Sequence, residues 1–147
     1  MNALNHYSED DWIRLYQRLE ESVGVRLFTV TRVDLIDHTF ARVFSNRPEE
    51  YPVFGLKPAE RSDWSDLVIR DFQTFVANSY TELKARFADH ALIRSLGCES
   101  ILNIPIVQNG VVTHTINLLH EKGYYSPDRV ERSEAEVSYM IDLYDKL

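Results

Sequence analysis

Apolar residues near the start of the chain recur with the 3.6-residue spacing of an amphipathic helix. The pattern begins after Ser8, an N-cap residue that is followed by acidic side chains, and it ends at Gly24. The apolar positions between them are Trp12, Leu15, Tyr16, Leu19 and Val23. This spacing predicts a helix of about four turns.

Four later segments have the patterns of β-strands, two of them alternating and two of them mainly apolar runs. Residues 25–34 and 38–45 alternate on either side of a short polar turn and form one predicted hairpin. Residues 98–107 and 111–119 form a second, because Gln108-Asn109-Gly110 joins them and Asn-Gly between apolar runs is a strong hairpin signal.

The chain between the two hairpins is irregular. Residues 46–62 contain three prolines and a glycine, and this composition predicts a long loop. Residues 64–72 carry apolar side chains on one helical face, residues 75–76 fit a short strand, and residues 91–96 fit a short helix. A last helix is predicted from Pro127, which suits the first turn of a helix.

Composition is that of an ordinary globular domain. The 147 residues are 44% hydrophobic and 27% charged, which fits a single domain over 1–147. No apolar run approaches the roughly 18 residues of a membrane span, and the polar N-terminus is unlike a signal peptide, so we expect a cytoplasmic protein without a membrane partner. The net charge of −7 and the scattered basic residues argue against binding of nucleic acid.

Cysteine and histidine positions limit the cofactor chemistry. Cys98 is the only cysteine, which excludes an internal disulfide, a CxxC redox pair and a cysteine-rich zinc site. The histidines show none of the spacings that metal sites use on one strand or helix; they are His6, His38, His90, His114 and His120. We therefore expect neither a metal nor a cofactor.

The order of these segments resembles that of a GAF domain. The resemblance rests on a strand that ends near a proline, an Asn-Gly turn, a return strand and a Tyr-Tyr-Ser-Pro step before the last helix. The segments that carry it are Leu92–Ile106, Asn109–Val112, Thr115–Leu119 and Gly123–Pro127. The resemblance implies an α+β fold with a central antiparallel sheet of five or six strands. The first and last helices would cover one face, and a loop with short helices would cover the other, where GAF domains commonly hold a small ligand.

Two asparagines and two aromatic residues are candidates for binding a ligand. Asn103 and Asn117 interrupt apolar strands, where a buried amide needs hydrogen-bond partners, so they either face a pocket or tie the strands to a neighbouring loop. Tyr51 and Trp64 lie in the segment that should cover the sheet, where an aromatic ring either closes over a ligand or fills the core. The nearby cations, Lys57 and Arg61, either hold an anionic group or are solvated.

Two histidines extend this candidate set. Many GAF domains have a glycine near Thr113 and His114, so an imidazole there either fills part of the pocket or adds a polar group to it. His90 follows Asp89, in the segment where bilin-binding GAF domains carry a cysteine beside a histidine, and Asp89 cannot form a thioether. The acidic signature of cyclic-nucleotide GAF domains is also missing here. The predicted ligand-binding residues are thus Tyr51, Trp64, His90, Asn103, His114 and Asn117.

Three functions fit these features. The first is a stand-alone sensory or regulatory GAF-like domain that binds a small organic molecule between the sheet and residues 47–96, and that forms a homodimer through its first and last helices. The second is a thiol-dependent reductase resembling free methionine-(R)-sulfoxide reductase, with Cys98 as the nucleophile and His90 or Arg94 lowering its pKa. That chemistry needs a second thiol, which favours a protein that is not an enzyme. The third is a protein-interaction module whose pocket is closed.

Overall fold

The computed structural model describes residues 7–145, so both ends of the predicted domain, residues 1–6 and 146–147, lie outside the described residues. Within the described part, the strands form one six-stranded antiparallel sheet in the order β3-β2-β1-β6-β5-β4. The elements in chain order are α1 Glu9–Ser22, β1 Leu27–Asp34, β2 Thr39–Ser45, β3 Lys57–Pro58, α2 Asp63–Ser65, the π-helix η1 Asp66–Arg70, β4 Phe75–Ala77, α3 Tyr80–Arg86, α4 His90–Ser95, β5 Ser100–Gln108, β6 Val111–His120 and α5 Pro127–Asp145. The predicted α+β architecture is confirmed.

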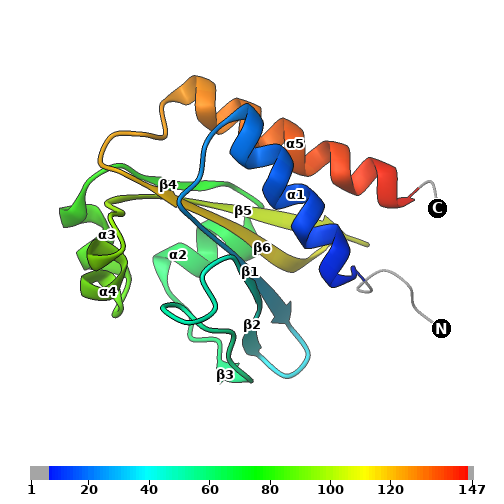
Figure 1. The fold of residues 1–147 in the computed structure, drawn as a ribbon. Coiled ribbons are helices and arrows are strands. Elements are labelled where there is room, and N and C mark those ends of the chain that lie inside the picture. Colours follow the sequence, from blue (N-terminus) through cyan, green and yellow to red (C-terminus); the bar gives the residue numbers. More distant parts are fainter. Residues whose placement is uncertain (1–6, 146–147) are drawn as a thin grey trace.

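Helices α1 and α5 lie side by side on one face of the sheet (Figure 1). Ser8 caps α1 as predicted, because its hydroxyl accepts from the Asp11 backbone while the Asp11 carboxylate accepts from the Ser8 backbone. The helices bury their apolar stripe against alternate residues of the central strands. This core includes Trp12, Leu15, Leu19, Phe28, Val30, Leu102, Ile104, Ile116, Leu118 and Val137.

The opposite face is covered by the chain between β2 and β5, which holds α2, η1, α3 and α4 (Figure 1). A second and smaller core lies here; its members are Leu27, Tyr51, Ala77, Leu83, Ile93, Cys98, Ile101 and Leu119. The helical side and the insert side therefore have separate cores on the two faces of one sheet. This arrangement is the one that the GAF resemblance implied.

Two β-bulges change which side chains share a face. In the β1–β2 pair, Val30 is opposite Phe44 and Thr31 is opposite Arg42, so Val43 has no direct partner. In the β5–β6 pair, Ile106 is opposite His114 and Val107 is opposite Val112, so Thr113 is the extra residue. Since side chains alternate with a period of two, each extra residue moves all later side chains of its strand to the other face.

The insert differs from its prediction in two places. Residues 64–72 do not form one regular helix: a single α-helical turn leads into η1, and Phe72 then takes a positive φ of 60° that ends the segment. The predicted loop 46–62 contains the two-residue strand β3, which pairs with the start of β2. The Asn-Gly hairpin is confirmed, with Asn109 and Gly110 both at positive φ, as a type I′ turn requires.

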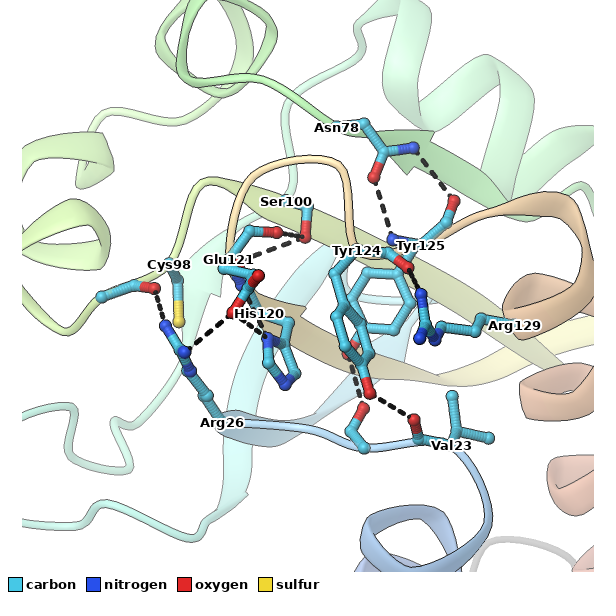
Figure 2. Close-up of polar contacts among 12 residues, drawn as sticks. Val23, Arg26, Asn78, Cys98, Ser100, His120, Glu121, Tyr124, Tyr125 and Arg129 are labelled. Atoms are coloured by element: carbon cyan, nitrogen blue, oxygen red, sulfur yellow. Dashed lines mark hydrogen bonds and ion pairs between the residues drawn. The ribbon is translucent and has the colours of Figure 1, made fainter.

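A polar junction joins the two layers at one end of the molecule (Figure 2). The Tyr124 hydroxyl donates to the Val23 carbonyl at 2.5 Å, and the Tyr125 hydroxyl donates to the Gly24 carbonyl at 3.2 Å. The Asn78 side chain bonds the Tyr125 backbone in both directions at 3.0 Å. The end of α1, the start of α5 and the turn before α3 are thereby tied to one another.

Candidate functional site

A buried polar floor crosses the three central strands on the insert side of the sheet. Asn103 on β5 and Asn117 on β6 are directly opposite each other, and Thr29 on β1 is opposite Asn117. Asn103 Nδ2 donates to Asn117 Oδ1 at 2.7 Å. Asn117 Nδ2 donates onward to the hydroxyls of Thr29 at 3.1 Å and Thr31 at 3.2 Å. The two predicted asparagines thus belong to one hydrogen-bonded chain.

Trp64 donates the first hydrogen bond of this hydrogen-bonded chain. Its position in α2, after the Ser62 cap, directs the indole towards the sheet, and Nε1 donates to Asn103 Oδ1 at 2.9 Å. The indole also meets the Phe40 ring edge to face, with centroids 6.2 Å apart. Trp64 is therefore anchored to the floor by a directional bond.

A cavity of about 540 Å³ lies between the floor and the insert. This volume falls in the range that small-molecule sites occupy, and the mixture of an apolar wall with a few polar groups is typical of them. The aromatic residues that line it are Phe40, Tyr51, Phe54, Trp64 and Phe87. A pocket of this size does not fit the closed-pocket alternative.

Charged residues sit at the rim of the cavity. The Arg42 guanidinium lies over the Tyr51 ring at 3.8 Å and over the Phe54 ring at 4.6 Å, and its Nη1 donates to the Pro52 carbonyl at 2.8 Å. Burial lowers the pKa of Arg42, although guanidinium stays charged at any physiological pH. The Tyr51 hydroxyl donates to Asp89, and burial followed by this carboxylate raises the pKa of Tyr51 far above its usual range. Tyr51 therefore remains a neutral donor.

Four of the six predicted ligand-binding residues line this cavity, namely Tyr51, Trp64, Asn103 and Asn117. His90 does not line it: on α4 its Nδ1 is 2.7 Å from the Tyr80 hydroxyl. Of the two predicted cations, Lys57 lines the cavity, whereas the exposed Arg61 pairs with Asp66 at 3.3 Å.

The prediction that His114 shares the cavity with the two asparagines is wrong, because His114 lies on the helical side of the sheet. Only 2% of it is exposed, and its ring packs against Tyr7 and Trp12. Burial, together with the nearby Arg32, lowers the pKa of His114 to about 4. The physical reason is the strand period, because His114 and Asn117 are three residues apart on β6 and must point to opposite faces.

The most important cavity residue that sequence reasoning missed is Arg42. The register that starts at the β1–β2 turn places Arg42 opposite Thr31, and the bulge at Val43 comes only after this pair. Phe40, two residues earlier on β2, shares the cavity face with Arg42. The alternation of Phe40 and Arg42 along β2 was the only signal in the sequence, and it does not show which face of the sheet the two side chains occupy.

No protein-family model matches the sequence, and no curated protein matches it either. Solved structures do match. The GAF domain of a two-component sensor histidine kinase from Bacillus halodurans superposes with a TM-score of 0.68 at 20% identity, over 95% of this chain and 97% of that one. The GAF domain/HD domain protein from Geobacter sulfurreducens gives 0.72 at 14% identity, over 90% and 88%. The chain has the GAF fold.

A third match is a GAF domain that absorbs blue light. The blue-light-absorbing form of the Thermosynechococcus elongatus PixJ GAF-domain superposes with a TM-score of 0.68 at 15% identity, over 93% of this chain and 84% of that one. These identities are low, so the matches establish the GAF fold alone. The resemblance that the sequence suggested is confirmed at that level.

Cys98 has the surroundings of a structural residue in this GAF fold (Figure 2). It is 0% exposed and belongs to the insert-side core, and burial raises the pKa of its thiol to about 11. Nearby Arg26 opposes this rise only in part, since its guanidinium donates to the Gly97 carbonyl at 2.8 Å and pairs with Glu121 at 2.9 Å. A sealed, protonated thiol is unsuited to the nucleophilic role of the reductase alternative.

Residues 7–145 contain neither a cluster of metal ligands nor a membrane-spanning helix. Within that range no group of three or more histidine, cysteine or acidic side chains is placed to hold a metal ion. His6 lies outside the described residues. None of the helices in this range is both long and apolar enough to cross a bilayer.

Proposed function

We propose that this chain is a sensory or regulatory domain that binds a small organic molecule in the cavity between the sheet and residues 47–96. The observation that carries the proposal is the buried polar floor beneath a cavity of about 540 Å³. Hydrophobic residues at Asn103 and Asn117 would stabilise the sheet more simply, because a buried amide must recover its lost hydration through hydrogen bonds. A polar floor under aromatic walls is useful when something polar occupies the space above it. The GAF domain of a sensor histidine kinase among the structural matches agrees with a sensory role.

Thermal unfolding in the presence of a metabolite library tests this proposal. A ligand at 100 times its Kd stabilises the folded state by about 2.7 kcal/mol, which is a shift of several degrees in Tm. Compounds that shift Tm are then measured with Thr31→Val, which removes one floor hydroxyl. The matched control is Thr81→Val on the exposed surface of α3, outside the cavity lining.

The expected result is binding that weakens in Thr31→Val and is unchanged in Thr81→Val. A library that shifts no Tm, or compounds that bind both variants equally well, would contradict a ligand site above the floor.

We also propose that the domain forms a homodimer through α1 and α5. A groove of about 190 Å³ runs between these helices, and two apolar residues one turn apart on α5 border it. Tyr139 is 48% exposed and Leu143 is 49% exposed. Exposed apolar residues around a groove are typical of a surface that another protein covers.

Analytical ultracentrifugation tests the dimer. Leu143→Glu should shift the protein from dimer to monomer at micromolar concentration, because it buries a charge in the interface. Ile36→Glu makes the same exchange at a residue that is 91% exposed in the β1–β2 turn, and it should leave the dimer intact. A monomeric wild type would rule out the proposal.

A further inference from the structure

The direction of the hydrogen-bond chain in the floor decides what the cavity can recognise. An indole N–H can only donate, so Asn103 must turn its Oδ1 towards Trp64 and its Nδ2 towards Asn117. Asn117 must then accept at Oδ1 and donate from Nδ2 to the hydroxyls of Thr29 and Thr31. Trp64 thereby fixes the orientation of both amides.

With the amides in this orientation, the hydrogen-bond chain ends in two threonine hydroxyls that can still donate. Each threonine hydroxyl accepts from Asn117 and keeps its own O–H to donate. Thr29 and Thr31 line the cavity and make no other side-chain hydrogen bond within residues 7–145. The floor therefore offers donors to an occupant.

Arg42 adds charged donors above the same floor. It is the cross-strand neighbour of Thr31, and its guanidinium packs against the Tyr51 and Phe54 rings. Of its five N–H groups, one bonds the Pro52 carbonyl, and within residues 7–145 the guanidinium forms no ion pair. Burial of this cation is costly; Asp89 offsets part of the cost by charge attraction without forming an ion pair, and an anion in the cavity would offset more of it.

The other charged residues that line the cavity also favour an anionic occupant. The Lys57 ammonium lies 4.2 Å from the Phe54 centroid, so Arg42 and Lys57 flank one ring. Among the described residues that line the cavity, Asp89 is the sole carboxylate, and the Tyr51 hydroxyl already donates to it. The third lining cation, Arg86, is 3.9 Å from Asp63. The lining thus has more cations than carboxylates, although the whole chain has a net charge of −7.

We infer that the occupant is an organic anion, a carboxylate with a planar apolar body. Arg42 and Lys57 would bind its carboxylate, Phe40 and Trp64 would pack on its planar body, and the Thr29 and Thr31 hydroxyls would donate to an acceptor atom at its inner end. This inference rests on the proposed function and specifies its ligand class. Arg42 is the residue that sets the specificity, because its planar fork matches a carboxylate in two bonds.

Matched probes that differ only in charge test the inference. For naphthalene, indole and quinoline, the carboxylate, the carboxamide and the aminomethyl compound are titrated into the full chain by isothermal calorimetry. Hydrogen bonds to charged groups are strong enough that the carboxylate of each scaffold should bind at least about tenfold more tightly than its amide. The quinoline acid, whose ring nitrogen is a second acceptor, should bind best.

Variants of Arg42 identify the group responsible. Arg42→Gln should remove the preference for the acid over the amide, and Arg42→Lys, which keeps the charge without the fork, should retain only part of it. Arg61→Gln removes an exposed arginine of the same insert, outside the cavity lining, and should change nothing. Thermal unfolding without a probe confirms that each variant is folded.

The possible outcomes distinguish failure of the anion inference from failure of the proposed function. Amides or amines that bind as tightly as the acids would overturn the anion inference and leave the proposed ligand site intact. A preference for the acid that survives in Arg42→Gln would overturn the role given to Arg42. Failure of every probe and of the whole metabolite library would overturn the proposed function and the inference together.

Discussion

The two faces of the sheet are built from the same strands and differ in what they bury. On the helical side, Leu102 and Leu118 pack with α1 and α5 in an apolar core. One residue further along each strand, Asn103 and Leu119 face the insert, where polar groups, aromatic rings and a cavity replace the close packing. The helical side therefore contributes most of the stability, and the insert side keeps polar groups that stability alone does not require.

The largest expected difference between the faces is the cost of shortening two adjacent leucines. Leu118 is fully buried in the helical core, and Leu118→Ala should lower the free energy of unfolding by about 4 kcal/mol, since the closely packed surroundings cannot collapse into the space. Leu119→Ala should cost only about 2 kcal/mol, because that side chain already borders the cavity. Urea unfolding measures both. Equal losses would show that the two faces are packed alike.

Acid should weaken the helical face through one side chain. The pKa of His114 is lowered to about 4 in the folded protein, whereas an unfolded histidine titrates near 6.5. The unfolded chain thus binds the proton first, so the contribution of His114 is complete above pH 6.5 and is lost as the pH falls to about 4. The loss should approach about 3 kcal/mol.

His114→Phe isolates this effect, because the phenyl ring can occupy the space between Tyr7 and Trp12 without titrating. The wild type should lose more stability than this variant between pH 6.5 and pH 4. The exposed His38→Asn, in the β1–β2 turn, should follow the wild type. Parallel pH profiles for the wild type and His114→Phe would mean that the imidazole is not sealed from solvent.

The sequence was sufficient to predict most of the fold and part of the cavity. Period, caps and the Asn-Gly turn were sufficient for the two hairpins, the short strand β4 and the first and last helices, whereas β3 lies in a segment predicted to be a loop. These signals are local in the sequence. The resemblance to GAF domains then placed the insert and its pocket on the correct face.

The details of the cavity depend on strand register, including a bulge that no local sequence pattern reveals. Without the extra residue Thr113, Asn103 would lie opposite Ile116, and Asn117 would turn to the helical side. Arg42 faces the cavity through its pairing with Thr31, which follows from the register of the β1–β2 turn. The sequence identified polar residues in unusual places, but only the register shows which of them meet.

The smallest expected effect concerns the bond that orients the floor. Trp64→Phe keeps an aromatic wall but removes the indole donor, so Asn103 Oδ1 loses its partner and the unfolding free energy should fall by about 1–2 kcal/mol. Asn103→Leu and the double variant complete a mutant cycle measured by urea unfolding. If the bond stabilises the floor as described, the two changes should be coupled by about 1 kcal/mol, because the loss of the indole N–H matters only while the amide is present. Additive effects would mean that Trp64 covers the cavity without holding the amides in their order, and the donors of Thr29 and Thr31 would then no longer be fixed towards the ligand.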